Sequence, residues 1–442
     1  MTSLFRRAIR CCSLVVVLAL IAAACGSDSP STLALGETVA SNESRETVLR
    51  LATADPRPLL SGIAEWERAH PTARVEIEVR QPEDLERSIL AGVDGVPIDL
   101  VTLDPTSRNS ARENPQRFVD LQEFASPAEL LSFPDDYLDA ALGAEAQLLG
   151  LPIYTDSLAL VVRTDILDGG DVRALSDAHS WCEVLTIAND FSLATQNAFF
   201  ANASDVARGL LAQTGDSLVD SDVNASVTGD ASLEEIWDTA TAALWIDPIH
   251  GGTCDNHSDF GAMSRNLRFA DEVWVEAALA DGFAATVVAY GELDELAAAI
   301  PDTAGDWEVL PLPGDVGTTG ELAHLGILST SEHVALAFDL VATLASPESQ
   351  RHSFSEGSPG LPTATELTQS DLVASAQNDF FNSDALAPFA DGLANRPITQ
   401  DTLERAVIVE ETLEAIVRVG GGEQNSTEAW AILLANIESR VP

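Results

Sequence analysis

From about residue 48 onward, short apolar segments alternate with longer segments that have helical periodicity. Strands are predicted where apolar residues are continuous or recur with a period of two, at 48–55, 75–79 and 97–104. Helices are predicted between them, from Leu59 to a stop at Pro71 and again at 84–93. This order favours a parallel sheet, and ligands of such sheets bind beyond the carboxyl ends of the strands.

The same kinds of segment continue to the end of the chain. Further strands are predicted at 154–167, 281–290 and 306–314, and helices at 232–244, 329–350, 402–419 and 427–439. The sequence has 442 residues. After a leader is set aside, roughly 400 residues remain, too many for one compact core. The pattern therefore predicts an α/β protein with two lobes.

The first residues have the pattern of an export signal. Three arginines precede an uncharged run from Cys11 to Ala24, which as a helix would reach only ~21 Å, short of the about 30 Å of a hydrocarbon core. Residues 1–24 are therefore predicted to be a signal peptide. Ala22-Ala23-Ala24-Cys25 resembles a bacterial lipobox, which implies a lipoprotein with lipid on Cys25; ordinary secretion and a retained span are the alternatives. Residues 25–46, rich in small polar residues, are predicted to be a flexible tether.

The charged residues of the sequence limit which functions are possible. There are 70 acidic and 23 basic residues, and the sequence contains no lysine. A surface of this sign argues against nucleic-acid binding. The absence of lysine excludes a phosphate-loop lysine, a kinase lysine and a Schiff base with pyridoxal phosphate. No Gly-x-Ser-x-Gly or His-Glu-x-x-His motif occurs. We expect no catalytic residue, no metal and no cofactor.

Two cysteines remain beyond the leader and the lipobox. Cys182 and Cys254 lie in a chain that is predicted to be exported, which favours a disulfide between them. A metal site is the alternative, because His250 and His257 flank Cys254, although this spacing matches no strong zinc pattern.

The order of segments resembles the extracellular solute-binding proteins of ABC importers, in particular the maltose-binding-like, sugar-type group. "IAEWERAHPTARVEIEV" is similar to the family's first helix and second strand, and "PIDLVTLD" to its third strand. "LLGLPIYTDSLALVVRTDIL" resembles its first crossover between lobes, and "DGFAATVVAYGELDEL" its Gly-x-Ala-Ala turn. "DWEVLPLPG", "ASPESQ" and "PGLPTATEL" follow in the family's order. The likeness covers nearly all of residues 47–440.

The resemblance implies a type II periplasmic-binding-protein-like fold, in which two lobes are joined by crossing hinge strands. Lobe 1 is expected to comprise 47–155 and 311–350, and lobe 2 to comprise 156–310 and 351–442. The solute would bind between the lobes and favour their closure. We expect a monomer that is lipid-anchored on the outer face of the cytoplasmic membrane and docks on an ABC permease.

The resemblance also implies which side chains face the solute. These are Asp55, Arg57, Asp104, Tyr154, Asp156, Tyr290, Glu292 and His324. Structural roles are the alternatives: Asp55 and Asp104 would cap helices, Tyr154 would pack at the hinge, Asp156 would bind hinge backbone, and His324 would be a satisfied surface histidine.

Capture of a sugar or a similar small polar solute is the function that this resemblance implies. The same fold could instead serve as a solute-loaded sensor for a membrane receptor. An exported hydrolase that uses paired carboxylates is a third hypothesis, and it would need such a pair beside a cleft.

Overall fold

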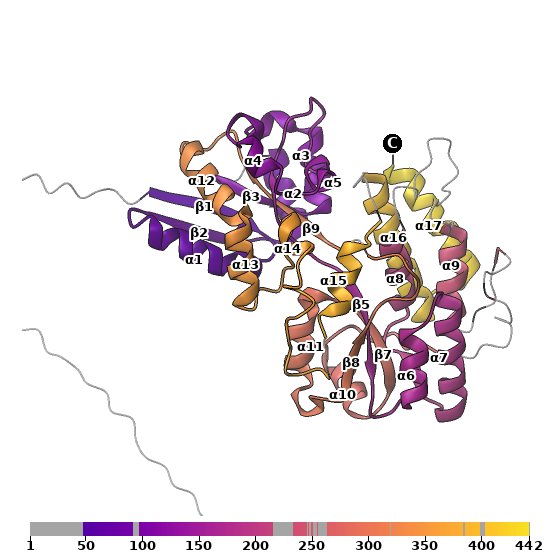
Figure 1. The fold of residues 1–442 in the computed structure, drawn as a ribbon. Coiled ribbons are helices and arrows are strands. Elements are labelled where there is room, and N and C mark those ends of the chain that lie inside the picture. The colour runs from indigo at the N-terminus through magenta and orange to yellow at the C-terminus, as the bar shows by residue number, and fades with distance from the viewer. Residues whose placement is uncertain are drawn as a thin grey trace, which may run out of the picture. The chain divides into compact units, whose positions relative to one another are not determined.

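The computed structural model describes most of the chain after the predicted leader and tether. The described residues are 47–91, 97–214, 233–244, 246, 249–250, 254, 263–318, 320–382, 385–397 and 403–441. Cys25 and the predicted signal peptide and tether lie outside them, as does His257. Two separate sheets organise the described part, which confirms the predicted two-lobed α/β architecture (Figure 1).

The first sheet has the strand order β2-β1-β3-β9-β4. Its strands are β1 (Thr47–Thr53), β2 (Ala73–Val79), β3 (Leu100–Leu103), β4 (Leu151–Thr155) and β9 (Leu322–Ile327). β1 pairs in parallel with β2 and β3, as predicted, whereas β9 runs antiparallel to both β3 and β4. The antiparallel β9 brings the residue before it to the edge where β3 ends.

Helices cover both faces of this sheet because the strands bury side chains on both sides. Leu49 and Leu51 pack in the cluster that contains α1 (Leu60–Ala69) and α12 (Val334–Ala345). Ala52 faces the opposite cluster, formed with α2 (Pro82–Ala91) and α3 (Pro105–Glu113). This is the alternation that a strand with period two requires.

The second sheet has the strand order β6-β7-β5-β8. Its strands are β5 (Leu158–Arg163), β6 (Ala198–Phe200), β7 (Phe283–Ala289) and β8 (Trp307–Leu310). One face packs on α6 (Gly169–Ser176), α7 (Trp181–Thr195), α8 (Asp205–Gln213), α9 (Leu233–Ala242), α16 (Leu403–Gly420) and α17 (Ser426–Arg440). The other face packs on α10 (Glu272–Leu279), α11 (Leu293–Ala299) and α15 (Ala387–Ala394). In Figure 1, α16 lies beside α8, α9 and α17.

Within the described residues, the chain passes between the two sheets in three places. The first passage joins β4 to β5, and the second joins β8 to β9. The third follows α13 (Pro347–Ser355), where Leu361 exchanges backbone hydrogen bonds with Thr155 at 2.8 and 2.9 Å. All three passages therefore meet beside the end of β4.

One sequence-based expectation is wrong in this region. A single helix was predicted for 329–350, but α12 ends at Ala345 and α13 begins at Pro347. Ser346 has extended backbone and its hydroxyl accepts a hydrogen bond from the Ser349 amide at 3.2 Å. A residue before proline disfavours the helical conformation, so Ser346-Pro347 ends one helix and starts another.

Candidate functional site

Three carboxylates gather where the strands of the first sheet end. Asp55 follows β1, Asp104 follows β3, and Glu321 precedes the antiparallel β9. The side chain of Glu321 is still exposed, but the surrounding chain removes part of its hydration, and the negative charges of Asp104 and Asp55 repel its charged form. Both effects raise the pKa of Glu321 above its ordinary value.

Asp55 and Asp104 also have local structural partners. The Arg57 guanidinium pairs with Asp55 at 2.7 Å, and the Arg57 amide donates to the same carboxylate at 2.9 Å. Asp104 caps α3 by accepting from the Ser107 amide at 2.8 Å. The capping role considered for Asp104 is therefore present, while Asp55 and Arg57 form an ion pair at the protein surface.

Asp156 lies at the first passage between the sheets. Its Oδ1 accepts hydrogen bonds from the Ser157 amide at 2.7 Å and the Tyr290 amide at 2.8 Å. Burial raises the pKa of Asp156 to about 7; the Ser157 hydrogen bond opposes this shift and the charge of Glu292 adds to it. Through these two hydrogen bonds, Asp156 links the residue before β5 to the residue after β7.

The two predicted tyrosines pack at the passages. An added Cβ at Gly360 would lie 2.7 Å from Cβ of Tyr154, so the third passage presses on this side chain. The Tyr290 hydroxyl donates to the Ser358 carbonyl at 3.1 Å, and its ring lies against Phe354. Burial is the main cause that raises the pKa of both phenols.

Glu292 is engaged within the second lobe. Its carboxylate accepts from the Ala289 amide at 2.6 Å and pairs with Arg208 at 2.9 Å. The carboxylate therefore orients Arg208 at the end of β7.

His324 does not lie on the surface, and that expectation is wrong. The side chain is fully buried within β9. Arg108 can only donate, so Nδ1 of His324 accepts from it at 2.9 Å, and Nε2 donates to the Tyr137 carbonyl at 2.7 Å. Burial and the charge of Arg108 hold the pKa of His324 well below its ordinary value. Both ring nitrogens are occupied, which leaves neither for a solute.

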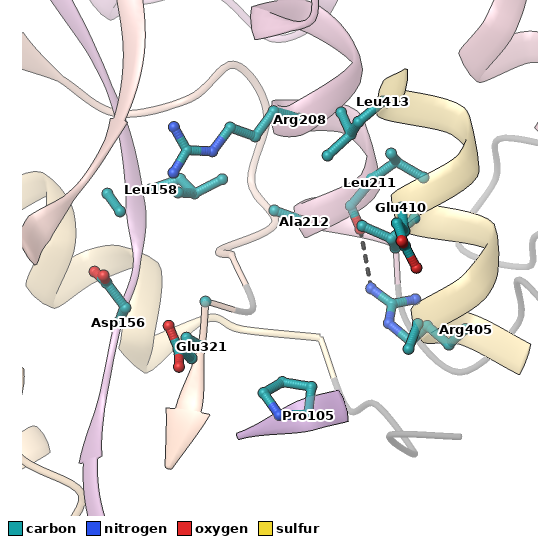
Figure 2. A pocket seen from close by; sticks show the side chains of 14 residues that line it. Pro105, Asp156, Leu158, Arg208, Leu211, Ala212, Glu321, Arg405, Glu410 and Leu413 are labelled. Atoms are coloured by element: carbon teal, nitrogen blue, oxygen red, sulfur yellow. Dashed lines mark hydrogen bonds between the residues drawn. The ribbon is translucent and has the colours of Figure 1, made fainter. Parts of the chain in front are cut away.

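A cavity of about 410 Å³ lies where residues from both sheets approach one another. Its lining residues are Pro105, Asp156, Leu158, Arg208, Leu211, Ala212, Ala289, Gly320, Glu321, Arg405, Ala406, Val409, Glu410 and Leu413. Figure 2 shows Asp156 and Glu321 on one side of this cavity and the α16 residues Arg405 and Glu410 on the other. Among the side chains predicted to contact solute, Asp156 belongs to this lining.

Sequence reasoning missed the residues that helices contribute to the cavity. Arg208 and Leu211 come from α8, which was not predicted, although Ser204-Asp205 ahead of an apolar-periodic segment is a usable helix-start signal. Arg405 and Val409 come from α16, which was predicted without knowing which face points inward. Glu321 was missed because no strand was predicted at 322–327.

The two cysteines beyond the leader are joined. The Sγ atoms of Cys182, in α7, and Cys254 are 2.10 Å apart. His250 instead binds Asp238, with Nδ1 3.2 Å from the carboxylate. Within the described residues, no group of three or more His, Cys, Asp or Glu side chains could hold a metal ion. In the same residues, no helix is long and apolar enough to cross a membrane.

Comparisons with known proteins agree on one class. A family model for bacterial extracellular solute-binding proteins matches residues 52–351. A solved extracellular solute-binding protein of family 1 is 20% identical with a TM-score of 0.73, covering 90% of this chain and all of its own. A comparison with curated proteins finds no significant match.

Two further solved structures share the fold with this chain. A solute-binding protein from Thermotoga lettingae, bound to α-D-tagatose, has a TM-score of 0.67 at 15% identity over 90% of this chain and all of its own. The sugar-binding protein MalE of Xanthomonas citri has a TM-score of 0.66 at 18% identity, over 89% of this chain and 96% of its own. The two-lobed periplasmic-binding-protein fold is therefore shown.

Proposed function

This chain belongs to the bacterial extracellular solute-binding protein family, whose members are non-enzymatic components of transport, and we propose that it captures a sugar or similar small polar solute. The solute would occupy the cavity between the ends of the two sheets and stabilise the closed arrangement of the lobes. It would then be released to the permease subunits of an ABC importer.

The observation that carries this proposal is the composition of the cavity walls. Residues of the first sheet's edge, such as Glu321, and residues of helices that cover the second sheet, such as Arg208 and Arg405, line one space. A volume of about 410 Å³ suits a small solute. The similar structures include one bound to tagatose and a maltodextrin-binding protein complexed with maltotetraose, which supports a saccharide.

We also propose that lipid on Cys25 holds the mature chain at the outer face of the membrane. The uncharged run before Cys25 and the lipobox-like Ala22-Ala23-Ala24-Cys25 support this. More than one acyl chain is needed for stable anchoring, which a modified cysteine at the mature N-terminus would supply. Mass spectrometry of the wild-type mature chain should find acyl chains on Cys25, and a mature chain whose Cys25 carries no lipid would contradict the anchor.

A thermal-shift screen tests the capture of a solute. The mature chain would be heated with sugars, polyols and amines, because a solute at about 100 times its dissociation constant stabilises the folded state by ~2.7 kcal/mol. A saturable rise in melting temperature with a saccharide is expected. Arg208→Gln should reduce that rise, whereas Arg351→Gln, on an exposed pair with Glu366, should leave it unchanged. Equal responses of the two variants would place the solute outside this cavity.

A further inference from the structure

The cations of the cavity already have partners within the protein. Arg208 pairs with Glu292 at 2.9 Å and donates to the Val287 carbonyl at 3.1 Å. Arg405 donates to the carbonyls of Leu211 and Thr214, each at 3.0 Å. The charge of Arg208 is therefore compensated by Glu292, and two donor N–H groups of Arg405 are occupied by carbonyls, which leaves both groups fewer donors for an anionic solute.

The carboxylates of the cavity are balanced to different degrees. Glu410 pairs with Arg440 at 2.8 Å, and the charge of Arg208 favours the ionised form of Asp156. Within the described part of the chain, Glu321 has no hydrogen bond and no ion pair, and it interacts electrostatically with Asp156. Asp156 satisfies Oδ1 with two backbone amides, while its Oδ2 lies 3.4 Å from the Gly291 amide and keeps acceptor capacity.

Neighbouring charges do not reverse this imbalance. The carboxylates of Asp55 and Asp104 repel the charged form of Glu321. Arg57 is bound to Asp55, and Arg108 donates to the Leu322 carbonyl at 2.6 Å and to His324. A positively charged group placed between Asp156 and Glu321 would therefore remove repulsion as well as form hydrogen bonds.

The rest of the lining determines what would carry that positive charge. The cavity has an aliphatic wall formed by Leu158, Leu211, Val409 and Leu413. Among the described residues that line it, none is aromatic. A bare metal ion would make no apolar contact with this wall, and the described residues contain no cluster that could hold such an ion. An organic molecule with C–H surface fits the space better.

We propose that the preferred solute is a saccharide-like molecule that bears a protonated amine, with the amine bound between Asp156 and Glu321. Its C–H surface would lie against Leu158, Leu211 and Leu413. This inference rests on the proposed capture of a solute in the cavity and narrows its chemical class from polar solutes in general to cationic sugars.

Isothermal titration of the mature chain at neutral pH with matched disaccharides tests the inference. The β-1,4 dimer of glucosamine, cellobiose and the N-acetylated dimer share one linkage and differ at the amine. We expect the amine form to bind at least about tenfold more tightly than the other two disaccharides, because hydrogen bonds between charged groups are stronger than those between neutral groups. Glu321→Gln should remove most of this difference. Glu332→Gln, beyond the opposite end of β9 on an exposed side chain, should not.

The remaining outcomes separate this inference from the proposed function. Equal or tighter binding of cellobiose would overturn the preference for an amine and leave sugar capture intact. Spermidine is the fourth probe: if it binds while every disaccharide fails, and Glu321→Gln weakens it, amine recognition stands and sugar capture falls. Absence of binding by all four probes would overturn the inference.

Discussion

The two walls of the cavity are built from different kinds of element. On the side of the first sheet, the wall consists of residues that lie where strands begin or end, such as Glu321 beside β9 and Pro105 after β3. On the side of the second sheet, helices supply much of it, with Arg208 from α8 and Arg405 from α16. Strand ends fix their side chains through the sheet, whereas the helical wall depends on how well each helix is seated.

The seating of those helices relies on a disulfide and on a close contact between two helices. Cys182 of α7 is joined to Cys254, and Gly209 of α8 lets that helix approach the indole of Trp181 closely. In the first lobe, Leu49 and Leu51 are instead held by strand pairing and by α1 and α12. We therefore expect changes in the second lobe to disturb the cavity most.

Loss of the disulfide should have the largest effect on stability. Residues 182 and 254 are 72 positions apart, and closing a loop of this length stabilises the folded state by about 4 kcal/mol in the chain-entropy model. The double variant Cys182→Ala, Cys254→Ala should lose a comparable amount in urea unfolding. Reduction of the wild-type chain should add the mass of two hydrogens. An unchanged mass or unchanged urea midpoint would contradict the crosslink.

Gly209→Ala should have the next largest effect. The added methyl group would collide with the Trp181 indole, whose Nε1 is held by Gln213 at 2.9 Å. Overpacking costs about 1–3 kcal/mol, and the better helix propensity of alanine returns up to ~1 kcal/mol. A net loss of unfolding free energy, together with weaker solute binding, is expected.

Gly169→Ala is the matched control for this variant. Gly169 begins α6, and an added Cβ there would contact nothing within 4 Å. Its stability should remain within about 0.5 kcal/mol of wild type. If Gly209→Ala behaves like this control, close seating of α8 is not what positions the helical wall.

The difference between the wall of strand ends and the wall of helices also explains which features the sequence predicts. The strand–helix alternation of 48–104 and the polar residues after β1 and β3 follow from period-two and helical patterns, because both lie in local sequence. The lining by Arg208, Arg405 and Glu321 does not, since it depends on which helix face turns inward and on an antiparallel strand from the far end of the chain. His324 was misplaced for the same reason: Arg108 and Tyr137, which surround it, are distant in sequence.

Asp156, at the passage between the lobes, should make the stability of the protein depend on pH. Its pKa is raised to about 7 in the folded protein from an ordinary value of 3.8. Between these values the folded state binds more protons than the unfolded state, so this group's contribution makes stability fall as pH rises from about 4 to 7. The slope is at most about 1.4 kcal/mol per pH unit.

Asp156→Asn should remove that contribution. Urea unfolding at several pH values would give the difference between the two chains, which cancels the titration of groups common to both. The difference should grow in favour of the variant as pH rises. A difference independent of pH would show that Asp156 is ionised throughout and that its burial does not control its titration.

The smallest expected effects come from removing the hydroxyl groups of the two tyrosines at the passages, Tyr290 and Tyr154. Tyr290→Phe removes the hydrogen bond from its hydroxyl to the Ser358 carbonyl, 3.1 Å away, which should cost about 1 kcal/mol of unfolding free energy. Tyr154→Phe keeps the packing against Gly360, and its hydroxyl has no hydrogen bond within the described residues, so its stability should change little. Solute affinity should be nearly unchanged in both, because neither ring lines the cavity. A large loss of affinity in Tyr154→Phe with stability preserved would show that this hydroxyl contacts the solute. The binding surface would then include residues of the first sheet outside the cavity lining described above.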